Sequence, residues 1–169
     1  FVKRAYAISE EFDTPVLLRL STRVAHSQSA VELLPREEVP VRDYQKNVAK
    51  NVMVPANARP KHVIVEQRTQ ALEAFNNTCD LNRVEMNDTK IGIITAGIAY
   101  QYAREALPNA SFLKLGMINP LPEQLIRDFA AKVDVCYVIE ELDPVLERQI
   151  RAMGIAVCGK DKLTMIGEY

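Results

Sequence analysis

The chain has 169 residues, of which 48% are hydrophobic and 25% charged, a composition typical of one globular domain with additional segments. Lys and Arg number 21 against 22 Asp and Glu, without a block of like charge, so neither nucleic acid nor a membrane is expected as a partner. No apolar run approaches the roughly 18 residues of a membrane span, and the first residues lack a secretion signal. Three cysteines without a CxxC pair argue against a disulfide framework, and a cytoplasmic location is expected.

The first region contains no glycine, because all six glycines lie at or after Gly92. Residues 2–12 have the pattern of a helix. After Pro15, the apolar stretch 16–21 predicts a strand. One helix and one strand cannot bury both of their faces, so we expect them to belong to a larger domain and the chain to be a piece of a longer protein.

Residues 30–60 contain four prolines and mixed charge, which is typical of an extended connector. A short helix is expected within it, around residues 44–49. A longer helix is expected over 61–76, because Ile64, Leu72 and Phe75 recur on one side of the helical pattern.

From residue 88 on, short apolar strands alternate with amphipathic helices. This alternation predicts right-handed βαβ units and therefore a three-layer α/β fold, in which a mainly parallel sheet carries helices on both faces. The predicted strands are 90–95, 111–116, 135–140 and a final one near 155–158, and the predicted helices are 98–107, 122–132 and 144–153.

The last predicted helix has the clearest end signals. Asp143 is expected to cap it and Pro144 suits its first turn. Glu147 and Arg151 are spaced to form an ion pair, and Gly154 can end the helix in a left-handed conformation.

Ligands of open parallel sheets bind beyond the carboxyl ends of the strands, here residues 95–97, 116–119 and 140–143. At the first end, Thr95 and Gly97 precede a helix whose free N–H groups suit an anion, yet a lone glycine also simply serves the turn. At the third end, Glu140 is one of three carboxylates, which fit an acid/base site or a helix start stabilised by the dipole. Both interpretations stay open at each end, and no metal site is predicted.

Arg23 and His26 lie in a polar cluster directly after the predicted strand 16–21. Polar residues at a strand end are typical of a binding loop, and an arginine there can hold a carboxylate or phosphate. A solvated loop or an ordinary domain contact is the alternative. We therefore regard Arg23 and His26 as a candidate substrate-side or domain-contact loop.

Long stretches of the sequence resemble the large subunits of indolepyruvate:ferredoxin oxidoreductases, members of the thiamine-diphosphate-dependent 2-oxoacid:ferredoxin oxidoreductase family. The stretches are EEFDTPVLLRLSTRVAHS, VMVPANARPKH, RVEMNDTKIGIITAGIAYQYAREALPNASFLKLGMINPLP and VIEELDPVLERQIRAMGI. Enzymes of this family oxidatively decarboxylate 2-oxoacids, transfer the acyl group to coenzyme A and send electrons through iron–sulfur clusters to ferredoxin.

The resemblance implies a domain assignment for this chain. Residues 1–28 are expected to be the last helix and strand of a pyrimidine-binding domain, and residues 29–87 a connector with helices. Residues 88–169 are expected to form a domain similar to the carboxy-terminal domain of transketolase. For the whole enzyme the resemblance implies thiamine diphosphate, magnesium and iron–sulfur clusters as cofactors. The implied partners are the remaining domains, a smaller second subunit, ferredoxin and coenzyme A.

No GDG…N motif for a magnesium diphosphate and no C-x₂-C-x₂-C-x₃-C run for a cluster occurs in the chain. We therefore expect no catalytic or cofactor-binding residue here, and an assembly scaffold that is inactive alone. The alternative is a separate small-molecule or anion-binding α/β module that uses the strand-end crevice near Gly97 and Glu140.

Overall fold

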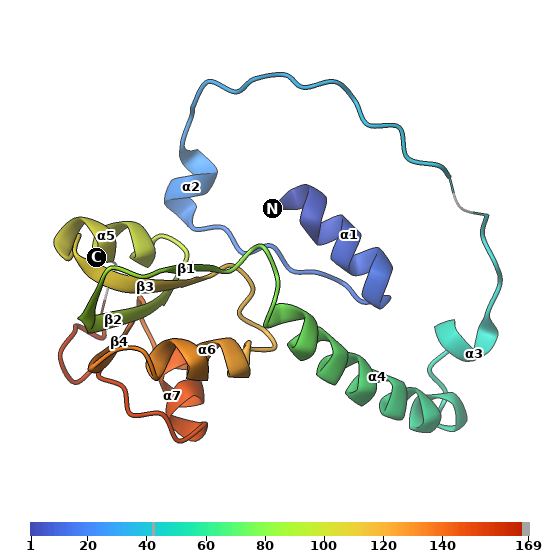
Figure 1. Ribbon diagram of the computed structural model, residues 1–169. Helices are drawn as coiled ribbons and strands as arrows, with labels where there is room; N and C mark the ends of the chain where they lie inside the picture. The colour runs from blue at the N-terminus through green and yellow to red at the C-terminus, as the bar shows by residue number, and fades with distance from the viewer. Residues whose placement is uncertain (42, 167–169) are drawn as a thin grey trace. The chain divides into compact units, whose positions relative to one another are not determined.

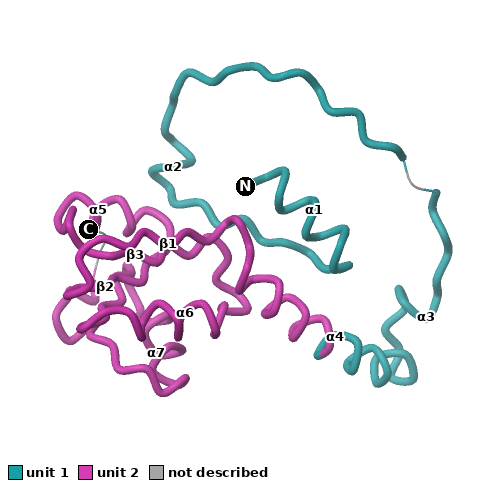
Figure 2. Tube along the Cα trace, viewed as in Figure 1, with its two compact units in different colours: residues 1–66 teal, residues 67–169 magenta. Residues whose placement is uncertain are grey.

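The computed structural model describes residues 1–41 and 43–166. The chain divides into two compact units, Phe1–Glu66 (unit 1) and Gln67–Tyr169 (unit 2), which Figure 2 shows in teal and magenta. One residue of the expected connector and the last three of the expected 88–169 domain lie outside the described residues.

Unit 1 begins with helix α1 (Val2–Phe12), as predicted, and the helix ends at Asp13 in a left-handed conformation. The predicted strand at 16–21 is wrong. A strand requires another strand to pair with its backbone, and no described segment pairs with these residues. The segment is extended and is followed by the single-turn helix α2 (Thr22–His26), whose Val24 N–H donates to the side chain of Ser21.

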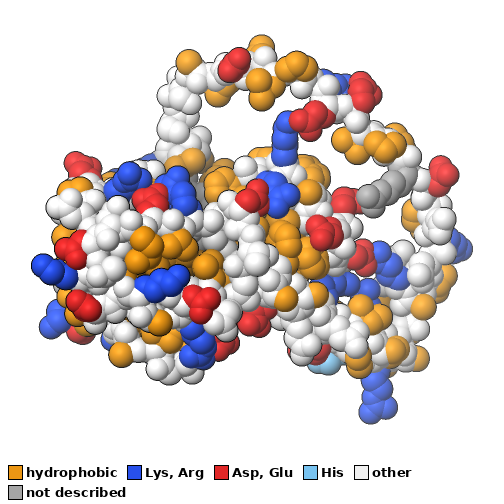
Figure 3. All heavy atoms as spheres, viewed as in Figure 1, with side chains coloured by type: hydrophobic (Ala, Val, Ile, Leu, Met, Phe, Trp, Pro, Cys, Tyr) orange, Lys and Arg blue, Asp and Glu red, His pale blue; other side chains and the backbone are white. Residues whose placement is uncertain are grey.

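The segment of unit 1 that was expected to be a connector is mostly extended, and its apolar side chains are exposed. Leu33 is 92% and Val41 97% exposed, and Figure 3 shows apolar groups along this segment. The short helix expected at 44–49 is instead α3 (Val48–Asn51), because Asn47 caps it by accepting a hydrogen bond from the Lys50 N–H at 3.0 Å.

Helix α4 (Pro55–Asn76) starts six residues before the predicted start at 61. Pro55 occupies the first helical position, where its missing N–H costs nothing. Pro60 lies inside the helix, where it removes one hydrogen bond without ending the helix. Although α4 has 22 residues, no helix in the described part of the chain is long and apolar enough to cross a membrane.

Unit 2 contains a four-stranded, mostly parallel sheet in the order β1-β3-β2-β4 (Figure 1). The strands are β1 (Arg83–Glu85), β2 (Asp88–Ala96), β3 (Ala110–Leu115) and β4 (Val135–Ile139). Strand β2 pairs in parallel with β3 and β4, and β1 pairs antiparallel with β3. The three parallel strands confirm the prediction, whereas β1 was missed because three residues are too short to show alternation. The predicted strand near 155–158 is reduced to one bridge between Tyr137 and Cys158.

Helices cover both faces of the sheet, which confirms the three-layer α/β arrangement. Helix α5 (Ala99–Ala106) packs on the face that contains Ile93 and Phe112. Helices α6 (Glu123–Ala130) and α7 (Val145–Ala152) pack on the face that contains Ile94 and Leu113. Consecutive strand residues point to opposite faces, so adjacent pairs such as Ile93 and Ile94 build two separate cores. Burial of both faces explains why the strands are almost continuously apolar.

Candidate functional site

At one edge of the sheet, the loops that follow two neighbouring strands lead to helices on opposite faces. The chain leaves the central strand β2 for α5 on one face, and it leaves the neighbouring strand β4 for α7 on the other face. In open α/β sheets this divergence is where ligands bind. The structure brings two of the predicted strand ends together here, because Thr95 is in register with Ile139, the residue before Glu140.

The carboxylate of Glu140 is used by the fold. Its two oxygens accept hydrogen bonds from the backbone N–H groups of Leu146 at 2.8 Å and Glu147 at 2.9 Å, which caps α7. The ammonium of Lys160 donates to the Glu140 carbonyl. The prediction that Asp143 caps α7 is therefore wrong. Pro144, which adjoins the helix, makes no side-chain cap bond, and the longer Glu140 side chain supplies the acceptor from the strand end. The predicted Glu147–Arg151 ion pair forms at 2.8 Å, and Gly154 ends the helix with φ 80°.

The turn at Thr95 and Gly97 lies between β2 and α5. Gly97 has φ 62°, and a side chain there would meet no atom within 4 Å, so the backbone conformation of the turn, and not a close approach, favours glycine. Thr95 is fully buried, and its hydroxyl makes no hydrogen bond within the described part of the chain. The adjoining start of α5 has no side-chain cap. This strand end therefore retains unused polar groups.

The strand end at residues 116–119 is covered by the chain itself. The Asn76 side chain is fully buried and donates to the carbonyls of Met117 at 2.9 Å and Pro120 at 2.8 Å. Asn82 accepts from the Gly116 N–H at 2.9 Å and donates to the Asn76 side chain at 2.8 Å. A side chain at Gly116 would collide with the carbonyl of Leu81. Sequence analysis missed this contact, although the asparagines around residues 76–82 were its visible signal.

The structure does not place Arg23 and His26 in a loop. Both lie in the single-turn helix α2, three residues apart, and both are exposed. They belong to unit 1, outside the sheet, so their candidate role rests on the residue types alone.

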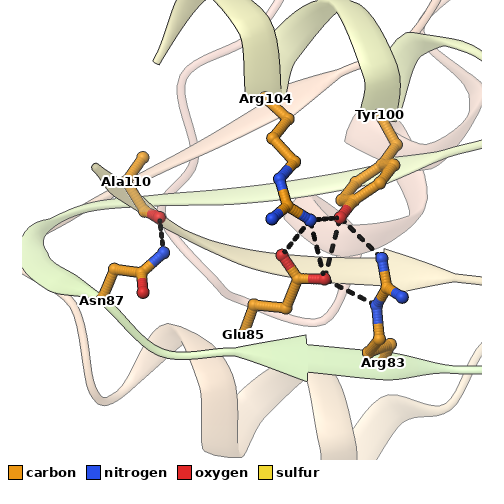
Figure 4. Close-up of polar contacts among 6 residues, drawn as sticks. All are labelled: Arg83, Glu85, Asn87, Tyr100, Arg104 and Ala110. Carbon is orange, nitrogen blue, oxygen red and sulfur yellow. Dashed lines mark hydrogen bonds and ion pairs between the residues drawn. The ribbon is translucent and has the colours of Figure 1, made fainter. Parts of the chain in front are cut away.

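A cluster of charged groups around Tyr100 was not predicted (Figure 4). Tyr100 is 1% exposed, and its hydroxyl donates to Glu85 at 2.8 Å and accepts from Arg83 and Arg104, each at 2.6 Å. Glu85 forms ion pairs with Arg83 at 2.6 Å and Arg104 at 3.1 Å. The hydrogen bond to Tyr100, followed by the charge of Glu85, raises the pKa of Arg104 above its ordinary value. The cluster depends on a pairing between β1 and β3 that spacing along the chain does not reveal.

Neither the cavities nor the potential metal ligands of the described residues indicate a second ligand site. Two cavities, of about 390 and 300 Å³, lie at the amino-terminal edge of the sheet, beside Asp134 and Asp88 respectively. That edge is opposite to the one where ligands of parallel sheets bind. Within residues 1–41 and 43–166, no three His, Cys, Asp or Glu side chains come together as metal ligands.

Several IorA proteins match the chain over nearly its whole length. "Indolepyruvate oxidoreductase subunit IorA" of Archaeoglobus fulgidus is 36% identical over 95% of this chain and 27% of that protein. The subunits of Methanothermobacter marburgensis and Pyrococcus abyssi are each 35% identical, over 90% and 99% of this chain and 26% and 28% of theirs. The chain is homologous to IorA, the large subunit of indolepyruvate oxidoreductase. The resemblance seen in the sequence is thereby confirmed, and the chain spans about a quarter of the length of these IorA relatives.

Two further comparisons complete this picture. No family model matches the chain. Among solved structures, a 2-oxoglutarate:ferredoxin oxidoreductase from Magnetococcus marinus is similar, with 20% identity and a TM-score of 0.49. The similarity covers 63% of this IorA homologue and 20% of that chain.

Proposed function

We propose that the protein containing this chain is a thiamine-diphosphate-dependent indolepyruvate:ferredoxin oxidoreductase of the cytoplasm. It converts aryl 2-oxoacids to acyl-coenzyme A and passes the electrons through iron–sulfur clusters to ferredoxin, together with a smaller second subunit. The observation that carries this proposal is the identity of 35–36% to three IorA subunits over 90–99% of the chain. A match that runs from end to end supports common ancestry of the whole segment.

Within that enzyme, we propose that this chain is a connector followed by an α/β scaffold. The geometry of unit 2 supports this role. At residues 116–119 the strand end is covered by Asn76 and Asn82, and at Glu140 both carboxylate oxygens bind α7. Because these side chains form hydrogen bonds with the backbone of the chain itself, they are not free to act on a substrate.

The residues of this chain do not fit a magnesium-bound diphosphate. The sequence has no GDG…N motif, and the described acidic side chains do not gather into a metal-ligand set. Bound thiamine diphosphate would supply the carbanion chemistry of the reaction. No catalytic step is therefore assigned to residues of this chain.

The exposed apolar side chains of unit 1 support the proposed domain assignment. Val31, Leu33 and Val39 are each more than three-quarters exposed in the connector, and Leu17 is 92% exposed before α2. Exposed apolar groups in such density mark protein interfaces. We propose that residues 1–28 complete a pyrimidine-binding domain and that residues 29–87 pack along other domains. We further propose that residues 88–169 form a transketolase-C-like domain.

One observation favours a second candidate function, an anion or small-molecule site in the crevice near Gly97 and Glu140. The buried hydroxyl of Thr95 has no partner within the described residues, and it lies beside the uncapped start of α5. Such a polar group is available to a ligand that enters at this strand end.

The test compares the complete protein with the 169-residue chain. The complete protein, with its second subunit, should reduce ferredoxin with indolepyruvate only when thiamine diphosphate, magnesium and coenzyme A are all present. The chain alone should neither turn over nor bind thiamine diphosphate in calorimetry. Turnover by the chain alone would contradict the scaffold role, and failure of the complete protein with every aryl 2-oxoacid would contradict the assigned reaction.

A further inference from the structure

The cluster around Tyr100 has an excess of positive charge. Arg83, Arg104 and Lys114 all lie within 6.0 Å of the Tyr100 ring centre, whereas Glu85 is the one carboxylate that pairs with them among the described residues. Three cations against one anion leave a local charge of +2, in a chain whose net charge is −1. The ammonium of Lys114 contacts the ring at 4.9 Å and pairs with no described carboxylate.

Two of these cations face each other across the sheet. Arg83 of β1 is directly in register with Lys114 of β3. Residues in such a pair have Cβ atoms about 5 Å apart, and like charges there destabilise a sheet. A fold that retains this repulsion departs from the usual rule for strand pairs, and such departures are typical of functional positions.

The buried tyrosine holds the cations in fixed positions. The Tyr100 hydroxyl accepts from both guanidinium groups, and its ring packs edge-on against Phe112 in the core. The side chains of Arg83 and Arg104 are nevertheless each 54% exposed. Tyr100 therefore holds two partly exposed guanidinium groups that have further N–H donors. An anion that binds there meets donors that have already lost their conformational freedom.

The shape of this surface favours a protein partner. Small-molecule sites are concave, and neither of the two cavities described above is lined by Arg83, Arg104 or Lys114. Arginine is also a side chain enriched at the centres of protein–protein interfaces.

We propose that Arg83, Arg104 and Lys114 form a docking surface for an acidic segment of a partner protein. Carboxylates of the partner would bind the outward N–H groups of the two arginines and the ammonium of Lys114. The bound carboxylates would offset the repulsion between Arg83 and Lys114. The charge complementarity argues for an Asp- or Glu-rich surface, and the docking is independent of the reaction proposed above.

The experiment adds a synthetic polyglutamate peptide to the isotope-labelled 169-residue chain at low ionic strength and follows the NMR signals of the arginine side chains. The Nε–H signals of Arg83 and Arg104 should shift saturably, and binding should weaken as salt shortens the Debye length to about 8 Å at physiological ionic strength. Lys114→Gln should weaken binding about fivefold, the usual size of one surface charge contact. Lys132→Gln, an exposed position on another face with the same change in net charge, should have no effect.

Three results would overturn the docking surface. The first is the absence of shifts at Arg83 and Arg104, and the second is equal weakening by the Lys114 and Lys132 substitutions, which indicates non-specific charge attraction. In the third, inorganic phosphate shifts the same signals and polyglutamate does not, which makes the cluster a small-anion site. None of these outcomes bears on the oxidoreductase activity of the complete protein.

Discussion

Glu140, at the end of β4, accepts a hydrogen bond from the backbone N–H of Glu147 at 2.9 Å, inside the first turn of α7. The same carboxylate also accepts from Leu146, so one strand-end side chain satisfies two N–H groups that helix geometry leaves free. Negative charge at a helix start is further stabilised by the helix dipole. Of the two interpretations that the sequence left open for Glu140, the structure therefore supports the carboxylate at a helix start.

Glu140→Ala should lower the free energy of unfolding by about 2 kcal/mol, because it leaves two N–H groups of α7 without their acceptor. Asp143→Ala is the matched control. Asp143 was expected to cap the helix, but among the described residues its side chain makes no hydrogen bond to α7. Its backbone carbonyl, which accepts from the Val145 N–H at 2.8 Å, is retained in alanine, so the substitution should cost less than about 0.5 kcal/mol. Urea unfolding of both variants measures the difference. Equal destabilisation by the two substitutions would show that Asp143 contributes to the cap of α7 as much as Glu140 does.

Asn76→Ala should lower the free energy of unfolding by about 2–3 kcal/mol. The side chain is fully buried, and its loss leaves the carbonyls of Met117 and Pro120 without their donor. Asn109→Ala, at an exposed position, is the control and should stay within about 0.5 kcal/mol of wild type. Urea titrations followed by circular dichroism provide the comparison, and a loss below about 0.5 kcal/mol for Asn76→Ala would contradict the covering of this strand end.

Burial of Cys136, followed by the influence of Cys158, raises the pKa of the Cys136 thiol from 9.0 to about 12. The thiol is therefore protonated at pH 8, and thiolate chemistry is suppressed there. Iodoacetamide at pH 8 should modify Cys136 at least tenfold more slowly in the folded chain than in urea. Peptide mass spectrometry reads the rate at each cysteine, and equal rates in the two states would contradict burial of this thiol.

The same pKa shift predicts a pH dependence of stability. In the unfolded chain the thiol ionises near pH 9, whereas the folded chain keeps its proton until about pH 12. The contribution to stability is complete below pH 9 and is lost progressively as the pH rises from about 9 to about 12. Cys136→Val lacks the titrating group, so its unfolding free energy should fall less steeply over this range. Parallel curves for the two proteins would exclude a linkage through Cys136.

The hydrophobic pattern of the sequence predicted those strands and helices whose own residues show a clear periodicity. The consecutive pair Ile93 and Ile94 and the stripe that includes Ala99 and Ala103 reveal a strand and a helix without tertiary information. Strand β1 and residues 16–21 are the opposite case, because a strand is defined by its partner. Arg83–Glu85 pair with β3 despite a weak pattern, whereas the apolar residues 16–21 find no partner among the described residues.

The sequence located the residues at the strand ends, but it did not show what their side chains contact. Sequence alternation placed Thr95 and Glu140 at strand ends, and the structure shows that their two strands are neighbours, with Thr95 in register with Ile139. Whether a carboxylate at such an end faces a ligand or a helix depends on which N–H groups lie near it in space. The same holds for Arg83 and Lys114, which are 31 positions apart in the sequence and directly opposite in the sheet.

Thr95 has a fully buried hydroxyl without a hydrogen-bond partner among the described residues. Burying such a group without a partner costs about 1–3 kcal/mol, and valine has nearly the same shape. Thr95→Val should therefore unfold at higher urea, with a gain of about 1 kcal/mol or more, whereas Thr89→Val, at an exposed position of the same strand, should change stability by less than about 0.5 kcal/mol. Thermal shifts with inorganic phosphate and with acetate, measured on wild type and Thr95→Val, test for a ligand of that hydroxyl. A loss of more than about 1 kcal/mol in Thr95→Val would mean that the hydroxyl is satisfied in the folded chain, and the case for a ligand at this strand end would then fail.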